Sequence, residues 1–266
     1  MIDRFGRTID YLRISVTDRC NLRCRYCMPA EGVTLLPPAA ILRFEEIVEV
    51  ARAAADLGVT RMRLTGGEPL VRRGIDTLVA MLAGTGRVAE LSMTTNGQRL
   101  ARHAAALAAA GLRRVNVSID AVDPARYAAI TRGGDVRKVF AGIDAARRAG
   151  LNPVKLNCVL EAGGDDRDRQ EVAEFARREG LEIRVIRQMN LAAGCFAVVE
   201  GGTGGDCAHC NRLRLTSDGQ VRPCLFSDLT FSVRRLGAAQ ALRRAAAEKP
   251  ACGSACSNRP LHSIGG

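Results

Sequence analysis

The sequence contains no tryptophan, and aromatic residues make up only 4% of its 266 positions. A surface that stacks nucleic-acid bases needs more aromatic side chains than this. The sequence also lacks an apolar run of membrane-spanning length, and it begins with the polar stretch MIDRFGRTID, which does not have the pattern of a signal peptide. These absences argue against a membrane protein, an exported protein and a base-stacking nucleic-acid binder, so we expect a cytoplasmic protein.

Acidic residues are in the minority, because 28 Asp and Glu stand against 39 Lys and Arg and give a formal charge of +11. The basic residues are mostly arginines that are spread along the chain. Such an excess suits nucleic acid or a phosphate-bearing small molecule. Since aromatic residues are scarce, we favour the small molecule. The length suits one large α/β domain with a smaller appendage.

Cysteines are abundant, with ten in the chain, and they are clustered. Without an export signal, clustered cysteines indicate metal binding in a reducing compartment. Cys20, Cys24 and Cys27 follow the apolar stretch YLRISV with the spacing C-x3-C-x2-C. Three thiolates so close together can hold one iron–sulfur cluster and leave an iron open to a small molecule. A disulfide or zinc loop is the alternative, but zinc sites usually close with four ligands.

The middle of the chain alternates apolar strands with amphipathic, alanine-rich helices that end in glycine. This alternation predicts parallel βα units. Six strands are too few for a closed eight-stranded barrel, so the expected fold is α/β, an open partial (β/α)6 barrel of the TIM type over residues 1–190. We expect strands at residues 11–17, 59–65, 89–95, 113–119, 153–160 and 182–188, and helix ends at Gly58, Gly111, Gly150 and Gly180.

Chemistry-bearing motifs follow the first four expected strands: the cysteine loop, TGGEP, TTNG and SID. Catalytic groups in barrels of this kind lie at the carboxyl ends of the strands. In TGGEP, the two glycines allow close approach of the backbone to a ligand, and Glu68 can accept a hydrogen bond from an ammonium group. We therefore expect these loops to form one site.

The cysteine triad with Tyr26, followed by GGEP after the second strand, resembles the radical S-adenosylmethionine (SAM) superfamily. The resemblance implies a [4Fe–4S] cluster whose open iron is chelated by the amino and carboxylate groups of SAM. It also implies that the reduced cluster cleaves SAM to a 5′-deoxyadenosyl radical, which abstracts a hydrogen atom from the substrate.

A narrower resemblance covers most of the chain. The segments LRISVTDRCNLRCRYCMP, MRLTGGEPLVRR, TTNG, AGLRRVNVSIDAVD, GLNPVKLN and CNRLRLTSDGQVRPCLF are similar to the GTP 3′,8-cyclase family of molybdenum-cofactor biosynthesis. Cys207, Cys210 and Cys224 match that family's second cysteine set, which implies a second [4Fe–4S] cluster, with its open iron on the guanine of GTP, in a small C-terminal domain over residues 191–266.

The resemblance implies that GTP is converted to 3′,8-cyclo-7,8-dihydro-GTP after hydrogen abstraction at the ribose 3′ carbon. It implies an external one-electron donor of the flavodoxin or ferredoxin type, and a cyclic pyranopterin monophosphate synthase that takes the product. A homodimer is left open, and neither a membrane nor nucleic acid is expected as a partner.

The resemblance also assigns roles to individual residues. SAM contacts fall on Tyr26, Gly67, Glu68, Ser118, Arg184 and Met189. GTP contacts fall on Arg13, Arg63, Thr94, Lys155, Arg212 and Arg214. The terminal Gly265 and Gly266 would reach into the active site and assist the reaction. Independently of the family, Arg13, Arg63 and Lys155 lie in strands with an alternating apolar pattern, where an inward cation needs an anion. Salt bridges to neighbouring carboxylates are the alternative.

The sequence departs from the family near its C-terminus. Only the short segment MNLAAGCFAVVEGGTGG separates the sixth strand from the second cysteine set, the tail before the final glycines is also short, and Arg187 stands where the family has a glutamate. Three cysteines are extra: Cys195, Cys252 and Cys256. They are either thiols without a ligand role or ligands of a further metal site. Cys158 is expected in the core, and His209 on a solvated loop.

Two other functions therefore stay open. One is a related radical SAM enzyme that acts on a peptide or another nucleotide and uses auxiliary clusters built on the extra cysteines. The other is a non-catalytic iron–sulfur redox sensor or RNA-binding protein. The intact cysteine triad, Glu68 and the terminal glycines argue against the second.

Overall fold

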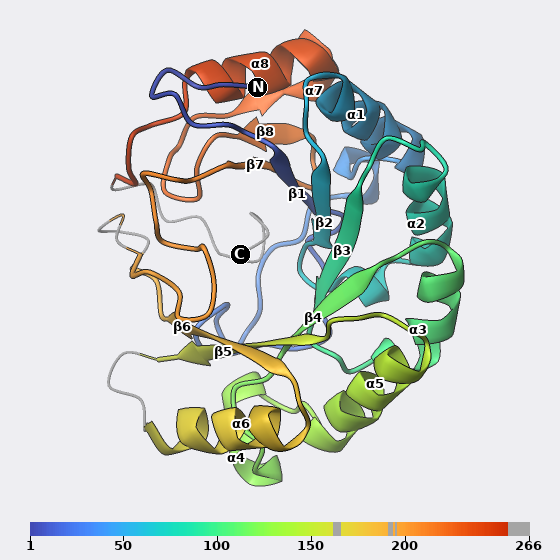
Figure 1. Ribbon diagram of the computed structural model, residues 1–266, viewed down its shortest axis with the longest axis vertical. Helices are drawn as coiled ribbons and strands as arrows, with labels where there is room; N and C mark the ends of the chain where they lie inside the picture. Colours follow the sequence, from blue (N-terminus) through green and yellow to red (C-terminus); the bar gives the residue numbers. More distant parts are fainter. Residues whose placement is uncertain (162–165, 191–193, 195, 255–266) are drawn as a thin grey trace.

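The computed structural model describes residues 1–161, 166–190, 194 and 196–254. Within them, one nine-stranded sheet curves around the middle of the molecule, and helices cover its outer face (Figure 1). The order across the sheet is β6-β5-β4-β3-β2-β1-β7-β8-β9. The strands are β1 (Tyr11–Ser15), β2 (Arg61–Thr65), β3 (Glu90–Thr95), β4 (Arg114–Ser118), β5 (Lys155–Leu160), β6 (Glu182–Arg187), β7 (Arg212–Leu215), β8 (Gln220–Arg222) and β9 (Phe231–Ser232).

The first six strands pair in parallel in the order of the sequence. All six were predicted, with ends that differ by no more than two residues from those observed. The sheet does not close, because β6 and β9 are its two edge strands. The predicted α/β fold with an open, partial barrel is confirmed.

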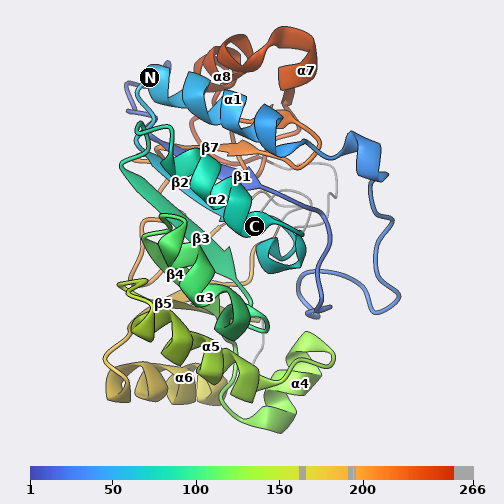
Figure 2. The same ribbon diagram turned by 90° about the vertical axis from the view of Figure 1, so that its right-hand side faces the viewer.

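The helices are connected to the strands in the expected alternation, and Figure 2 shows α1, α2, α3, α5 and α6 following one another down the outer face. The predicted helix ends are confirmed, since each of the four glycines has a positive φ. The helices are α1 (Phe44–Asp56), α2 (Ile75–Ala83), α3 (Leu100–Ala109), α4 (Pro124–Thr131), α5 (Val136–Arg148), α6 (Asp166–Arg178), α7 (Val233–Leu236) and α8 (Ala238–Ala247), with 3-10 turns at Pro38–Ala40 and Pro69–Val71.

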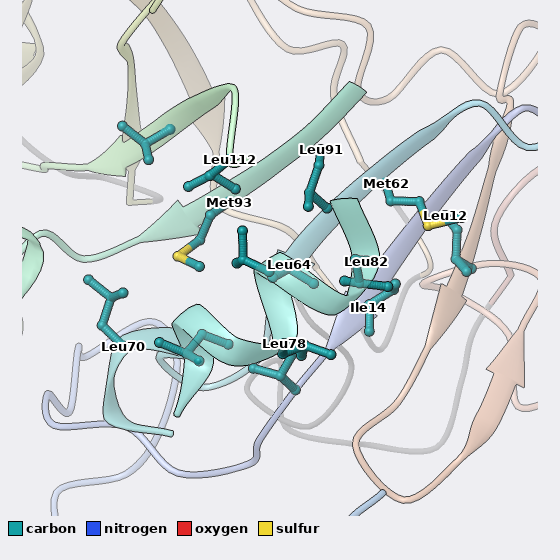
Figure 3. Close-up of a cluster of buried hydrophobic side chains, with 14 of the residues drawn as sticks. Leu12, Ile14, Met62, Leu64, Leu70, Leu78, Leu82, Leu91, Met93 and Leu112 are labelled. Carbon is teal, nitrogen blue, oxygen red and sulfur yellow. The ribbon is translucent and has the colours of Figure 1, made fainter. Parts of the chain in front are cut away.

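The main core lies between the sheet and its helices. Alternate residues of the strands, such as Leu12, Met62 and Leu64, are fully buried and belong to one cluster with Leu78 and Leu82 of α2 (Figure 3). Successive side chains of a strand point to opposite faces. The residues between these apolar positions therefore face the hollow of the sheet, and in β1 and β2 they are arginines.

The C-terminal region extends the same sheet. Strand β7 pairs in parallel with β1, and β8 and β9 follow in antiparallel fashion. Helix α8 packs beside α1. Among the described residues, the strands beyond residue 210 thus continue the barrel wall, and a domain boundary at residue 190 stays a prediction. No helix in the described part of the chain is long and apolar enough to cross a membrane.

Candidate active site

A cavity of about 390 Å³ lies in the hollow of the sheet. The cysteine loop and the TGGEP loop line one part of it. Inward residues of all seven strands from β1 to β7 line much of the rest. The loops that the sequence placed at the carboxyl ends of neighbouring strands therefore do meet around one space.

The first cysteine loop presents its three thiols to this cavity. The backbone N–H groups of Cys27 and Met28 both donate to the carbonyl oxygen of Cys24, at 2.9 and 3.1 Å, which turns the chain tightly. The backbone N–H of Leu22 donates to Cys20 Sγ at 3.4 Å, and Asn96 Nδ2 lies 3.9 Å from the same sulfur. All three thiols are free and partly buried, and all three line the cavity.

The loop fits a four-iron cluster. In the described residues, no three His, Cys, Asp or Glu side chains are close enough together to hold a single metal ion. A [4Fe–4S] cluster spreads its thiolates over a wider frame, because each thiolate binds a different iron. Backbone and side-chain N–H donors directed at a sulfur, as at Cys20, also stabilise a thiolate.

The TGGEP loop packs directly on the backbone that leads into the cysteine loop. Gly67 N donates to the carbonyl oxygen of Thr17, and Glu68 N donates to that of Arg19, both at 2.8 Å. A Cβ at Gly66 would lie 2.5 Å from the Thr17 oxygen, and one at Gly67 would lie 2.2 Å from the Arg19 oxygen. Only glycine fits at these two positions, so the two loops can meet only because glycine stands at both of them.

Glu68 ties this loop to the TTNG loop after β3. Its carboxylate accepts hydrogen bonds from Leu70 N at 3.0 Å, Thr95 Oγ1 at 2.7 Å and Asn96 N at 2.7 Å. Burial raises the pKa of Glu68, while these three hydrogen bonds act in the opposite direction. The carboxylate faces the cavity but is largely satisfied by the protein, so a ligand ammonium would be its fourth partner.

Tyr26 and Asp120 connect the cysteine loop to β4. Tyr26 Oη donates to Asp120 Oδ2 at 2.8 Å, and Val159 N donates to Asp120 Oδ1 at 2.8 Å. Burial raises the pKa of Asp120 to about 6, against the effect of these two hydrogen bonds. Asp120 was not assigned a role from the sequence, although it belongs to the SID motif that ends β4.

Three arginines form one layer across neighbouring strands. Arg13 is the register partner of Arg63 on one side and of Arg214 on the other. Arg63 and Arg214 are only 7% and 8% exposed. Burial, together with the neighbouring guanidinium groups, lowers the pKa of Arg13, and burial followed by repulsion from Arg212 lowers that of Arg214 to about 10. Holding these like charges together in a buried layer therefore costs the fold free energy.

Three cations surround the ring of Tyr11, which lies two residues before Arg13 on β1. The guanidinium carbons of Arg61, Arg63 and Arg212 lie 5.7, 5.5 and 5.9 Å from the centre of its ring, within the range of cation–π attraction. Its hydroxyl is buried and has no hydrogen-bond partner in the described structure. Four residues without a role predicted from the sequence also line the cavity: Tyr11, Arg61, Glu90 and Arg114. The period-two alternation with Arg13 and Arg63 was the available signal for the first two.

Lys155 does not line this cavity. Its ammonium forms an ion pair with Glu182 on β6, the salt bridge that the sequence left as the alternative. Arg114 on β4 does line the cavity, and it pairs with Glu90. The other residues that the sequence assigned to SAM or GTP all line the cavity: Arg13, Tyr26, Arg63, Gly67, Glu68, Thr94, Ser118, Arg184, Met189, Arg212 and Arg214.

The second cysteine set flanks β7 and β8, with Cys207 and Cys210 before β7 and Cys224 after β8. Cys207, Cys210 and Cys224 are free and partly buried, but they are not on the cavity wall, which next to them is formed by Asn211 and Leu225. Lys249, only 2% exposed, donates to the carbonyl oxygens of Arg212 at 2.8 Å and Pro223 at 2.6 Å. Burial tends to raise the pKa of Cys210, but the Lys249 ammonium and neighbouring donors outweigh it and lower that pKa.

Arg7 fastens the same region to the N-terminus. It is paired with the buried Asp3 at 2.6 Å, and its remaining N–H groups donate to the carbonyl oxygens of Cys207, Pro250 and Ala251. The first of these carbonyls belongs to the cysteine set, and the other two follow the set in the sequence. Residues distant in the sequence thus hold this set in place, and no local pattern indicated either Arg7 or Lys249.

The remaining predictions have mixed outcomes. Cys158 is buried in the core, as expected, and His209 is exposed, with its ring nitrogen 2.8 Å from Asp206. Cys252 is an exposed free thiol. Arg187 lines the cavity and lies 3.8 Å from Glu200. Cys195, Cys256, Gly265 and Gly266 lie outside the described residues.

Comparison with known proteins decides the family. The profile of the radical SAM superfamily matches residues 14–176. The GTP 3′,8-cyclase of Moorella thermoacetica is 43% identical over 305 aligned positions, which cover 94% of each chain. That of Thermodesulfovibrio yellowstonii is 40% identical and covers 89% of this chain and 88% of its own. The chain belongs to the GTP 3′,8-cyclase family of radical SAM enzymes.

Other comparisons bear on the length and the fold. The GTP 3′,8-cyclase of Mycobacterium marinum is 40% identical and aligns over 332 positions, so it has segments that this 266-residue chain lacks. Streptococcus suis SuiB, solved with bound S-adenosylmethionine, has a TM-score of 0.63 at 15% identity, covering 85% of this chain and 61% of SuiB. That likeness shows the shared radical SAM fold.

Proposed function

We propose that this chain converts GTP to 3′,8-cyclo-7,8-dihydro-GTP, the first step of molybdenum-cofactor biosynthesis. The layer formed by Arg13, Arg63 and Arg214 is the single observation that carries the proposal. Cations held together under burial destabilise the free protein, and a polyanion compensates for this. A triphosphate supplies several charges in one ligand, and guanidinium groups match phosphate geometry through paired hydrogen bonds.

The two ends of the cavity would take two ligands. Cys20, Cys24 and Cys27 would hold a [4Fe–4S] cluster at the loop end, with SAM against Tyr26, Gly67, Ser118 and Met189. When bound, the cluster and SAM supply the one-electron chemistry that removes the ribose 3′ hydrogen of GTP. Arg13, Arg63, Arg212 and Arg214 would hold the triphosphate at the other end and so fix the ribose in position for that step. Thr94, whose hydroxyl is buried without a hydrogen-bond partner in the described structure, is available to the nucleotide.

The second cysteine set would hold a second [4Fe–4S] cluster. Lys249 supports this because it links the segments that carry Cys210 and Cys224 and places a positive charge beside them. Three cysteine ligands would again leave one iron open, in this case to the guanine. The terminal Gly265 and Gly266 would assist the reaction from the cavity.

The proposal also includes partners. An external flavodoxin or ferredoxin would supply the electron, and a cyclic pyranopterin monophosphate synthase would take the product. Free thiols and oxygen-sensitive clusters suit the cytoplasm. A homodimer remains an open arrangement.

An anaerobic assay with the reconstituted enzyme, SAM, GTP and dithionite tests the proposal. We expect cyclised nucleotide and 5′-deoxyadenosine in equal amounts, and neither with the Cys20→Ala variant. Formation of 5′-deoxyadenosine with a peptide or another nucleotide, but not with GTP, would assign the chain to a related radical SAM reaction instead.

A further inference from the structure

A basic groove lies on the outer side of the first cysteine loop, away from the substrate cavity. It encloses about 380 Å³, and Asn21 and Leu22, which follow Cys20 directly, form one of its walls. Arg99, Arg102 and Lys138 are exposed on its other walls. In the part of the chain that the structure describes, these three cations form no ion pair. The groove therefore places three cations that form no ion pair in the described structure beside the loop that would hold the first cluster.

Leu22 is the partition between this groove and the cavity, because it lines both. It is almost fully buried, and its backbone N–H donates to Cys20 Sγ at 3.4 Å. One residue thus separates the groove from a cluster ligand. The cavity side of the same loop is the space that SAM and GTP would fill, which leaves the groove side as an approach for a macromolecule to the cluster that this loop would hold.

The cations of the groove are held in place because the segments just before α3 and α5 are hydrogen-bonded to each other. Gln98 and Asp135, just before α3 and α5, exchange two hydrogen bonds: Gln98 Nε2 donates to the Asp135 carbonyl at 2.9 Å, and Asp135 N donates to Gln98 Oε1 at 3.1 Å. A Cβ at Gly142 would lie 2.9 Å from the Gly97 carbonyl, so α5 packs closely on α3 one turn beyond Lys138. Lys138 and Arg99 are therefore held near one another.

The helices themselves add to this charge. The amino ends of α3 and α5 both face the groove, and a helix amino end carries a partial positive charge. The described residues that line the groove include no carboxylate, and the nearby Asp135 accepts from Arg137 Nε at 3.0 Å and is neutralised by it. The net character of the groove is positive.

We propose that this groove, defined by Asn21, Leu22, Arg99, Arg102 and Lys138, is the docking surface for an acidic one-electron donor protein. The inference rests on the proposed function, because that reaction needs an electron from outside the chain. Complementary charge raises the rate of encounter between two proteins, and it does so less as salt increases. The donor delivers one electron to the first cluster and is itself oxidised by one electron.

The test compares the Arg99→Glu/Arg102→Glu/Lys138→Glu variant with the parent enzyme, both with reconstituted clusters. The rate of cluster reduction is measured by stopped-flow absorbance with photoreduced flavodoxin, an acidic FMN protein, and separately with reduced methyl viologen, a small radical cation. The matched control is Arg52→Glu/Arg243→Glu, which reverses two exposed arginines on α1 and α8, at the far side of the molecule (Figure 1).

We expect the second-order rate constant with flavodoxin to fall at least tenfold in the groove variant at low salt, and the difference to narrow as salt rises. The rate with methyl viologen and the rates of the control should stay close to those of the parent. Unchanged reduction by flavodoxin, an equal loss with methyl viologen, or an equal loss in the control would overturn the docking surface. Absence of cyclised nucleotide with every donor would instead count against the proposed function.

Discussion

Lys249 Nζ donates a 2.6 Å hydrogen bond to the carbonyl oxygen of Pro223, the residue immediately before Cys224. The same ammonium donates to Arg212, two residues after Cys210. One buried cation thus joins the two segments that would hold the second cluster. A lysine is rarely buried without such partners, so its position indicates a structural role specific to this cysteine set.

The Lys249→Met variant should lose the second cluster. Methionine keeps the buried volume but leaves two carbonyl oxygens without a donor, at a cost of about 1–3 kcal/mol each. We expect about four iron atoms per chain after reconstitution, compared with about eight in the parent and in Lys249→Arg. Equal iron content in Lys249→Met and the parent would show that the lysine does not support a cluster.

The Arg63→Met and Arg214→Met variants should separate GTP binding from stability. Each variant removes a buried cation from a layer of like charges. Relief of that repulsion offsets lost contacts such as the 3.2 Å hydrogen bond from Arg63 Nε to Ser92 Oγ, so the melting temperature without ligand should change little. GTP affinity should fall about 10- to 100-fold, which corresponds to losing a charged hydrogen bond of about 1.5–3 kcal/mol. Thermal shift with and without GTP measures both effects. Arg113→Met, at an exposed position, serves as control. An Arg63→Met or Arg214→Met variant that loses stability but keeps GTP affinity would contradict a role of this arginine layer in GTP binding.

Gly67→Ala should abolish SAM binding. Gly67 does not have a positive φ, so the effect comes from its Cβ, which would lie 2.2 Å from the Arg19 carbonyl oxygen and push the TGGEP loop off the cysteine loop. Gly86→Ala is the control. Its φ of +66° makes alanine unfavourable by about 1–2 kcal/mol, but no atom lies within 4 Å of the new Cβ. Isothermal titration with SAM should show binding to the control and none to Gly67→Ala.

Asp120 should give the protein a characteristic pH dependence. Its pKa is raised to about 6 from 3.8, so between these values the folded state holds a proton that the unfolded state has lost. Stability from this group is therefore present at low pH and is lost as pH rises toward 6.

Asp120→Asn removes this loss. The variant should gain about 1 kcal/mol relative to the parent between pH 5 and pH 7, as measured by urea unfolding of the cluster-free protein. A parent and an Asp120→Asn variant with parallel pH profiles would mean that the carboxyl is ionised throughout.

The parallel strands could be predicted because they are short segments with regularly placed apolar residues, separated by helices of which several end in a glycine such as Gly111. It could not predict that β7 would join β1, since that pairing brings Tyr11 beside Arg212 across most of the chain, and pairing register is a tertiary property. The extension of the sheet by the C-terminal strands was missed for this reason.

The candidate site was predicted where local motifs carry it. The cysteine loop and the TGGEP loop meet because Gly66 and Gly67 permit close approach of the backbone, and these glycines could be recognised from the motif alone. The cations differ, because alternation shows that Arg13 and Lys155 have a defined face but not which carboxylates they meet. Lys155 pairs with Glu182, whereas the register partners of Arg13 are Arg63 and Arg214. Arg7 and Lys249 could not be foreseen, since their partners are backbone carbonyls far along the chain.

The central claim is that the substrate is GTP and that its ribose 3′ hydrogen is removed. GTP deuterated at the 3′ carbon, incubated anaerobically with the reconstituted enzyme, SAM and a reductant, tests this most directly by mass spectrometry of the products. The account predicts one deuterium in 5′-deoxyadenosine for each cyclised nucleotide formed. 5′-Deoxyadenosine that carries no deuterium, with GTP recovered unchanged, would contradict it.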